Sequence, residues 1–170
     1  MQIISIINQK GGVGKTTTVI NLAAGLSQLN KKILVIDLDP QGNATTGLGL
    51  SNMDNSSDTI YGVLNGTKEI GEVIKKTQFE NLDIITSNVD LSGLEVETAD
   101  DSNRAFILKT KLGAYLKDSR RSYDYVIIDC PPSLSLLTVM ALVCSNSLLV
   151  PLQTEFFALE GLTQLIKTIE

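Results

Sequence analysis

The residues with the clearest chemistry form a glycine-rich segment at positions 10–17, Lys-Gly-Gly-Val-Gly-Lys-Thr-Thr. An apolar run at residues 2–7 precedes it and a helical apolar pattern follows it, which is the context of a phosphate-binding loop. Glycines let backbone N–H groups turn toward phosphate oxygens, and the helix N-terminus adds its dipole. Lys15 suits the β- and γ-phosphates, and the Thr16 hydroxyl suits Mg²⁺. The predicted nucleotide contacts are Gly11, Gly12, Val13, Gly14, Lys15, Thr16 and Thr17.

The loop departs from the common pattern G-x-x-x-x-G-K-[ST] at its first position. Gln9 stands where that pattern has glycine, and a second lysine, Lys10, follows directly. Taken alone, Lys10 is explained by an ordinary solvated side chain. Its place at the entrance of a phosphate loop also allows a contact with nucleotide.

Three aspartates stand where apolar runs end. Asp37 and Asp39 close the run at residues 32–38, and Asp129 closes the run at residues 125–129. Ligands of open α/β sheets bind outside the carboxyl ends of strands, and an aspartate there commonly holds Mg²⁺ in phosphoryl-transfer proteins. An aspartate in this position can equally be a helix cap or a turn residue. Combined with Lys15 and Thr16, the pattern predicts a magnesium site formed by Thr16 and Asp129.

Apolar runs alternate with helical patterns along the chain. The runs are continuous, which is typical of buried parallel strands, and they cover residues 2–7, 32–38, 82–86, 125–129 and 147–152. Helical patterns cover the segment from the glycine loop to about Asn30 and then residues 60–64, 69–76, 104–116, 134–143 and 158–169. This alternation predicts an α/β fold with a mostly parallel sheet and helices on both faces. Residues 41–57 form a long polar connection, which we expect to be functional or disordered.

Composition narrows the possible functions. The 170 residues suit a single domain covering residues 1–170, and a chain without histidine has no histidine-based zinc site or Ser-His-Asp triad. The net charge of −5 argues against an intrinsically basic nucleic-acid surface. Cys130 and Cys144 lie in apolar settings, so we expect buried, reduced thiols and a cytoplasmic protein. We find no secretory signal and no apolar stretch long enough to span a membrane.

Three further motifs join the glycine loop in a resemblance that runs from Met1 to Glu170. The loop with its early lysine resembles the deviant Walker A loop of the ParA/MinD family of P-loop ATPases. The segments at residues 37–49 and 151–161 are similar to the chromosomal, Soj-like branch of the ParA partition proteins. The strand that ends in Asp129 and the proline pair after it complete the match. Family members are usually longer, so this chain resembles the N-terminal major part of the family's P-loop fold, truncated at its C-terminal side.

The resemblance implies roles for individual residues. Lys10 matches the lysine that reaches the partner subunit's nucleotide, so Lys10, Lys15 and Asp39 become the expected catalytic residues. Asp39 matches the residue that orients the attacking water, and Thr17 matches the α-phosphate contact. Thr16 and Asp129 match the magnesium side, while residues 40–43 and 130–135 match two segments that sense the γ-phosphate. The role of Asp37 stays open between tuning the magnesium shell and satisfying backbone N–H groups.

The family's biology gives the expected function. It implies an ATP- and Mg²⁺-dependent homodimerising switch in chromosome or plasmid partitioning, associated with the nucleoid in the cytoplasm. The ATP-bound dimer would bind DNA without sequence preference, through residues outside this chain, and a centromere-binding ParB-type protein would stimulate a slow hydrolysis. We expect no membrane partner. The basic pairs at residues 75–76 and 120–121 are better explained as solvated surface pairs than as DNA contacts.

Three other classes of function remain to be separated from this one. A MinD-like ATPase that positions division machinery would need a basic amphipathic membrane segment. An iron–sulfur reductase would need exposed cysteines, which Cys130 and Cys144 do not resemble. A nucleotide-binding scaffold without catalysis would show no hydrolysis with any stimulator.

Overall fold

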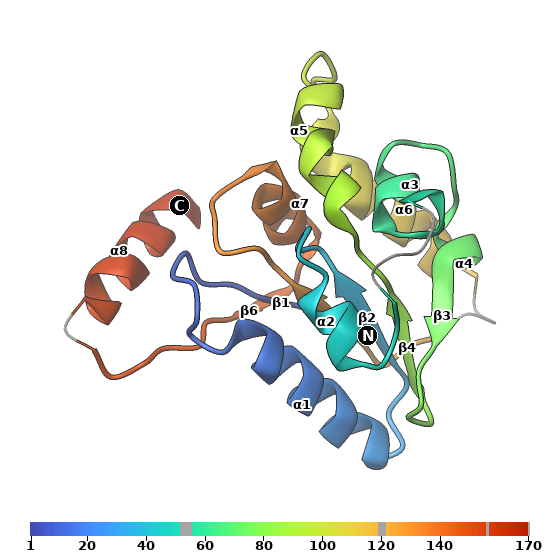
Figure 1. The fold of residues 1–170 in the computed structure, drawn as a ribbon, viewed down its shortest axis with the longest axis horizontal. Helices are drawn as coiled ribbons and strands as arrows, with labels where there is room; N and C mark the ends of the chain where they lie inside the picture. Colours follow the sequence, from blue (N-terminus) through green and yellow to red (C-terminus); the bar gives the residue numbers. More distant parts are fainter. Residues whose placement is uncertain (52–55, 119–121, 156, 170) are drawn as a thin grey trace.

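The computed structural model describes residues 1–51, 56–118, 122–155 and 157–169, and Figure 1 shows a twisted sheet between two layers of helices. Within these residues the sheet has six strands in the order β3-β4-β2-β5-β1-β6. The strands are β1 (Gln2–Ile6), β2 (Ile33–Asp37), β3 (Ile74–Lys76), β4 (Leu82–Ile85), β5 (Tyr125–Asp129) and β6 (Ser147–Leu149). The helices are α1 (Lys15–Gln28), α2 (Asn43–Gly47), α3 (Ile60–Leu64), α4 (Ile70–Val73), α5 (Leu94–Glu97), α6 (Ile107–Leu116), α7 (Leu136–Cys144) and α8 (Ala158–Ile169). Short 3-10 turns cover Ser56–Asp58, Val89–Gly93 and Arg104–Phe106.

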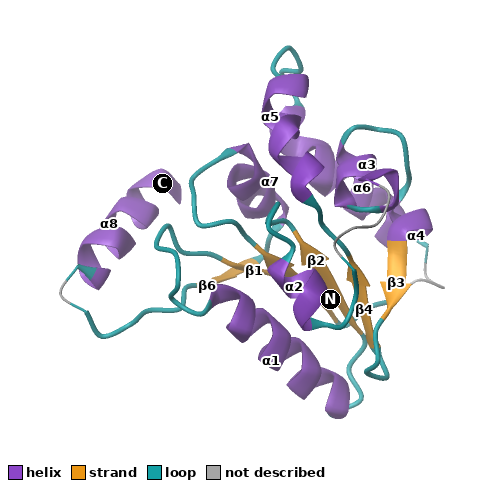
Figure 2. Cartoon of the chain, in the orientation of Figure 1, coloured by secondary structure: helices purple, strands orange, loops and turns teal. Residues whose placement is uncertain are grey.

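Alternate residues of the central strands pack against opposite helical layers. Ile33 and Val35 of β2 join the core under α1, whereas Leu34 and Ile36 join the core under α3, α4, α6 and α7. Figure 2 shows the two layers, with α1 and α2 on one side of the strands and α3, α4, α6 and α7 on the other. Both faces of a parallel sheet must be covered, which explains why the strand runs are continuously apolar. The predicted α/β fold with a mostly parallel sheet is confirmed.

The register of the three central strands brings their carboxyl ends to one level. Ile6 of β1 pairs with Asp129 of β5, and Asp129 pairs with Asp37 of β2. The glycine loop begins after β1, so it opens at the same rim as both aspartates. The predicted loop and carboxylates therefore lie at the same rim of the sheet.

The predicted helix at residues 69–76 is wrong in its second half. Helix α4 ends at Val73, and Ile74–Lys76 form strand β3, which pairs antiparallel with β4. The edge of β4 offers unpaired backbone groups, and satisfying them outweighs a weak helical pattern. The structure also places α2 inside the long polar segment at residues 41–57, of which residues 52–55 lie outside the described part of the chain. Asn30 follows the C-cap of α1, Leu29, and has φ of 57°, the left-handed conformation predicted for this position.

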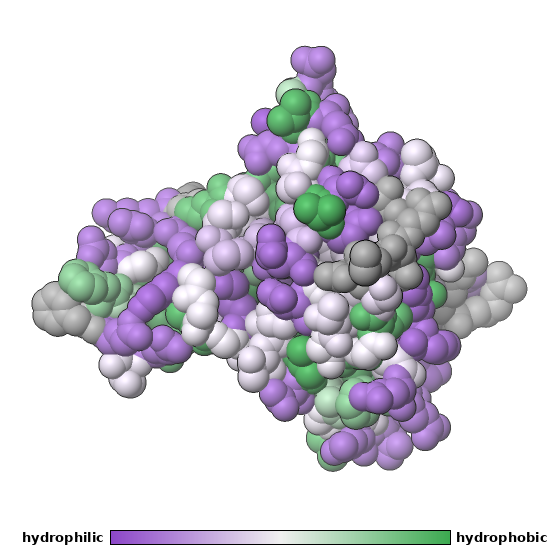
Figure 3. Space-filling view, viewed as in Figure 1, coloured by the Kyte–Doolittle hydropathy of each residue, from purple (hydrophilic) through white to green (hydrophobic). Residues whose placement is uncertain are grey.

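Apolar side chains on the surface are scattered. Figure 3 shows hydrophilic side chains over most of one face, interrupted by separate apolar patches. Exposed apolar side chains include Val96 on the projecting helix α5. Phe157, just before α8, and Leu159, in its first turn, are also exposed. Among the described residues, none of the helices has the length and apolar character needed to cross a lipid bilayer.

Two glycines in helices provide a test of the packing. A Cβ on Gly62 of α3 would lie 2.0 Å from the backbone oxygen of Ser57, whereas a Cβ on Gly25 of α1 would meet nothing within 4 Å. We expect Gly62→Ala to lower the free energy of unfolding by about 1–3 kcal/mol, because backbone must move to admit the methyl group. Gly25→Ala should raise it by about 0.5–1 kcal/mol through helix propensity. Urea unfolding of both variants measures the difference, and equal stabilisation by both would contradict this packing.

Candidate functional site

The glycine loop lies at the carboxyl end of β1 and turns into α1. Gly12 and Gly14 have φ of 74° and 88°, a left-handed conformation that side chains other than glycine rarely adopt. Gly14 is also the N-cap of α1, and no side chain caps this helix. The amides of the first helical turn have no partner inside the helix, so they can bind an anion.

A cavity of about 310 Å³ opens in front of this loop. Its walls bring together most of the predicted phosphate contacts with one of the predicted carboxylates. The lining residues are Gly11, Gly12, Gly14, Lys15, Thr16, Thr17, Asp39, Asn43 and Pro132. Val13 is absent from this wall and its side chain is buried. The cavity therefore combines a glycine loop, a cation, two hydroxyls and a carboxylate.

The side chain of Lys15 is held in place by the glycine loop itself. The residue is only 7% exposed, and its Nζ donates a hydrogen bond to the backbone oxygen of Lys10 at 3.0 Å. Burial lowers the pKa of Lys15, while the negative charges of Asp129 and Asp39 oppose that shift. A partly desolvated cation at the wall of a cavity interacts strongly with an anion that enters it.

Asp129 is fully buried and is not among the lining residues of the cavity, but it contacts Thr16, which is one of them. The Thr16 hydroxyl donates to Oδ2 of Asp129 at 2.7 Å, and Oδ1 of Asp129 is buried without a hydrogen-bond partner among the described residues. Burial raises the pKa of Asp129 to about 7, with a further contribution from Asp37 and an opposing one from Thr16. A buried carboxylate oxygen without a partner is costly, and a bound ion or a water molecule is one way to satisfy it.

These two side chains fit a magnesium ion. Mg²⁺ prefers oxygen ligands and usually takes one or two groups from the protein, with substrate phosphates and water completing its shell. A hydroxyl beside a carboxylate with a spare oxygen provides those two groups. Within the described residues no cluster of three or more histidine, cysteine or acidic side chains could hold a metal by itself.

Asp37 and Asp39 occupy different surroundings although one residue separates them. Asp39 reaches the cavity wall, and its Oδ1 accepts the backbone N–H of Gln41 at 3.0 Å. Asp37 is fully buried, and its carboxylate accepts from the backbone N–H of Asp39 and from both the N–H and the hydroxyl of Thr45. Burial raises the pKa of Asp37 to about 6, and the bonds from Thr45 oppose this shift. Of the two roles left open for Asp37, the structure favours satisfying N–H groups.

Lys10 does not face the cavity of its own chain. Its Nζ forms an ion pair with Glu155, and both side chains are about half exposed. The same connection after β6 touches the loop again where Gln153 Nε2 donates to the backbone oxygen of Gly12 at 3.1 Å. No sequence pattern predicts these two contacts, because they join segments more than 140 residues apart.

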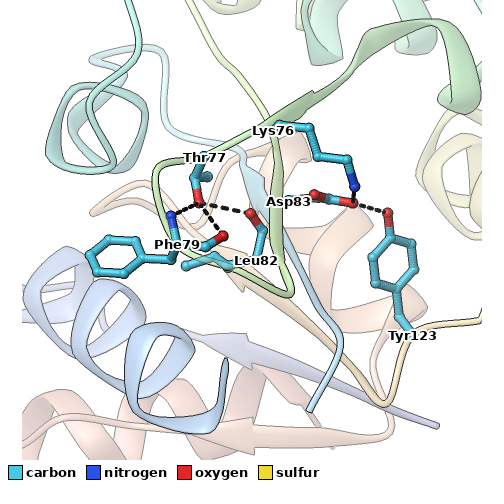
Figure 4. Close-up of polar contacts among 6 residues, drawn as sticks. All are labelled: Lys76, Thr77, Phe79, Leu82, Asp83 and Tyr123. Atoms are coloured by element: carbon cyan, nitrogen blue, oxygen red, sulfur yellow. Dashed lines mark hydrogen bonds and ion pairs between the residues drawn. The ribbon is translucent and has the colours of Figure 1, made fainter. Parts of the chain in front are cut away.

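A larger cavity, of about 650 Å³, lies at the opposite edge of the sheet. Figure 4 shows its polar groups bonded to one another: Asp83 accepts from Lys76 at 2.9 Å and from the Tyr123 hydroxyl at 2.8 Å. Nearby, the Thr77 hydroxyl donates to the backbone oxygen of Leu82 and accepts from the N–H of Phe79. These groups fasten β3 and its turn to the sheet and already have partners. The contrast with Oδ1 of Asp129 favours the cavity at the glycine loop as the functional one.

Among the described residues, neither the two cysteines nor Lys76 line the cavity at the glycine loop. Cys130 and Cys144 are free and buried, and burial raises the pKa of both thiols, that of Cys144 to about 11. Neither thiol is an exposed ligand for a cluster at the surface. Lys76 is paired with Asp83, and the basic pair at residues 120–121 lies outside the described residues.

The chain is similar to known proteins along its whole length. A family model described as an AAA domain matches residues 1–170. The sporulation initiation inhibitor protein Soj of Bacillus subtilis is 48% identical over 168 residues, which are 99% of this chain and 64% of Soj. The chromosome partitioning protein ParA of Caulobacter vibrioides is 47% identical over 170 residues, which are 62% of its length. The chain thus spans less than two thirds of these relatives.

Solved structures share the fold and include nucleotide complexes. A cobyrinic acid a,c-diamide synthase from Mycobacterium smegmatis, with bound ADP and magnesium, has a TM-score of 0.90 at 37% identity and covers 99% of this chain, which spans 66% of that protein. A putative plasmid partition protein from Borrelia burgdorferi bound to AMPPNP has a TM-score of 0.82 at 34% identity, with coverages of 99% and 67%. The family match and these identities over the whole chain show that the chain belongs to the ParA/Soj-type proteins of the AAA domain family.

Proposed function

We propose that this chain is the nucleotide-binding part of an ATP- and Mg²⁺-dependent ATPase that partitions chromosomal or plasmid DNA. The observation that carries the proposal is the pair formed by Thr16 and Asp129, in which a buried carboxylate oxygen is left without a partner beside the cavity of Lys15. The names of the relatives support partitioning, and the ligands of the solved neighbours support an adenine nucleotide with magnesium.

The residues divide the chemistry between them. The amides of the glycine loop and the Lys15 ammonium would bind the β- and γ-phosphates and hold them in line for attack. Thr16 and Asp129 would hold Mg²⁺, which neutralises charge on the phosphate oxygens when bound. Asp39 would accept a hydrogen bond from the attacking water and orient it. No covalent intermediate is needed, because positioning and electrostatics supply the catalysis.

Lys10 would act between two copies of the chain. In the free chain its ammonium is paired with Glu155, at a point where both groups reach solvent. Surface ion pairs contribute little, about 0–1 kcal/mol, so a nucleotide phosphate on a second subunit could replace Glu155. The ATP-bound homodimer would bind DNA without sequence preference, and a ParB-type protein would stimulate its slow hydrolysis and release.

Two substitutions separate nucleotide binding from hydrolysis. Lys15→Ala should abolish ATP binding, because it removes the cation at the wall of the cavity. Asp39→Ala should bind ATP within about threefold of the parent but hydrolyse it about 10²–10⁴-fold more slowly, because only the orientation of water is lost. Calorimetry measures the affinity and phosphate release measures the rate. Hydrolysis at the parent rate in Asp39→Ala would refute its role.

Asp129→Asn should stabilise the nucleotide-free protein in a pH-dependent way. The folded state raises the pKa of Asp129 to about 7, above the roughly 3.9 of an unfolded aspartate. The folded state therefore holds this proton more tightly, and the stability of the parent falls as pH rises between these two values. We expect the variant to gain on the order of 2 kcal/mol at pH 8 and almost nothing at pH 4, with loss of magnesium-dependent ATP binding.

Chemical denaturation at both pH values measures this gain, and the exposed Asp100 provides the control through Asp100→Asn. A control that shifted stability with pH to the same extent would show that the effect does not come from burial. An Asp129→Asn protein that gains the same stability at pH 4 and at pH 8 would lead to the same conclusion.

Co-sedimentation of the complete protein with DNA tests the biological role. DNA binding is expected with ATP and not with ADP or without nucleotide, because only the ATP-bound dimer presents the surface. Lys10→Ala should bind ATP yet stay monomeric in light scattering and leave DNA in the supernatant. ATP-dependent dimers of this variant would mean that Lys10 is merely solvated. Sedimentation with liposomes instead of DNA would support a MinD-like membrane ATPase.

A further inference from the structure

Asp37 is a buried carboxylate whose two oxygens are both used by the protein. Its Oδ1 accepts the backbone N–H of Asp39 at 3.2 Å. Its Oδ2 accepts the backbone N–H of Thr45 at 2.8 Å and the hydroxyl of Thr45 at 2.7 Å. Asp37 is not among the residues that line the phosphate cavity. Because both oxygens already accept hydrogen bonds from the chain, any effect of Asp37 on catalysis passes through the groups that it holds.

The Thr45 hydroxyl connects three elements of the rim. It donates to Asp37 at the end of β2, and it accepts the backbone N–H of Ser87, just beyond β4, at 3.0 Å. Thr45 is fully buried and belongs to α2. One hydroxyl thus fastens α2 to the ends of two neighbouring strands.

Helix α2 depends on such contacts for its position. It has only five residues, and its N-cap, Gly42, provides no side-chain cap. Helices of this length are not stable alone in water, so their placement comes from tertiary contacts. The bonds between Asp37 and Thr45 involve an ionisable carboxylate, and charge-assisted bonds are the stronger kind.

The segment between the two ends of this contact carries groups of the phosphate cavity. Asp39 and Asn43 both line the cavity. Between them, the N–H of Gly42 donates to the backbone oxygen of Asp39 at 2.9 Å, and Gln41 donates to its carboxylate. The segment is therefore a loop closed by the bonds between Asp37 and Thr45, and it carries Asp39 at the wall of the cavity.

We propose that Asp37 and Thr45 form a clamp that positions Asp39 for hydrolysis, a role that rests on the ATPase function proposed above. Both are positioning residues, which act through the loop and touch neither nucleotide nor metal. Loss of the clamp lets Asp39 drift, and a displacement of about 1 Å at a catalytic group can cost about 10²-fold in rate. The phosphate loop and Lys15 stay in place, so affinity for nucleotide is retained.

Thr45→Val in the complete protein tests the clamp, because it removes the hydroxyl and keeps the shape. We expect kcat for ATP hydrolysis to fall at least about tenfold while the dissociation constant for ATP changes less than about threefold. Thr45→Ser restores the hydroxyl and should recover most of kcat. Thr46→Val is the matched control, because the Thr46 hydroxyl is exposed and its hydrogen bonds among the described residues are to Gly42 and Asn43 of its own turn. This control should hydrolyse at the parent rate.

A folded Thr45→Val protein with the parent kcat overturns the clamp, and so does one that loses ATP affinity with kcat unchanged. A parent protein that hydrolyses no ATP under any condition overturns the proposed function instead. Amide exchange of the nucleotide-free parent tests the geometry independently of both. The N–H groups of Thr45 and Ser87 should exchange as slowly as those of β5. Exchange as fast as that of exposed loop amides would mean that the clamp does not form.

Discussion

The structure depends on two buried carboxylates held side by side at one rim of a parallel sheet. Asp37 and Asp129 are paired in the register of β2 and β5, and both are fully buried. Taking two negative charges out of water is unfavourable unless each finds partners. The two carboxylates differ in the number of hydrogen bonds that they accept. Asp37 receives three donors from its own chain, whereas Asp129 receives only Thr16 and keeps one oxygen unpaired.

This difference separates a structural carboxylate from one reserved for a ligand. A protein selected only for stability would complete both sets of hydrogen bonds or replace both residues by apolar ones. The unpaired oxygen of Asp129 therefore marks the place where a cation would repay the burial. At the opposite edge, Asp83 is also buried, but Lys76 and Tyr123 satisfy it. The cavity at that edge is larger than the one at the glycine loop, but the balance of polar partners favours the glycine loop as the functional site.

The sequence predicts the parts of this site that follow from periodicity and spacing. Continuous apolar runs located the parallel strands, and the glycine loop located the phosphate cavity, because both depend on residues adjacent in the chain. Strand β3 escaped prediction, since Ile74–Lys76 is short and its conformation comes from pairing with β4. The bond from Thr45 to Asp37 escaped as well, because nothing in a threonine's neighbours reveals which buried acceptor it will meet. The same holds for Glu155 and Lys10, which lie at opposite ends of the chain.

Solved proteins of similar fold have different functions. The cobyrinic acid a,c-diamide synthase structure superimposes over 99% of the chain, yet its name describes a biosynthetic enzyme rather than a partition protein. A fold shared to this extent does not fix the function, which depends on the groups that surround the site. Around the glycine loop of this chain, Gln153 and Glu155 of the connection after β6 contact Gly12 and Lys10, and Asp129 at the end of β5 contacts Thr16. Lys10, the early lysine of the loop, is thereby joined to a segment more than 140 residues away, so both ends of the chain contribute to the surroundings of the loop.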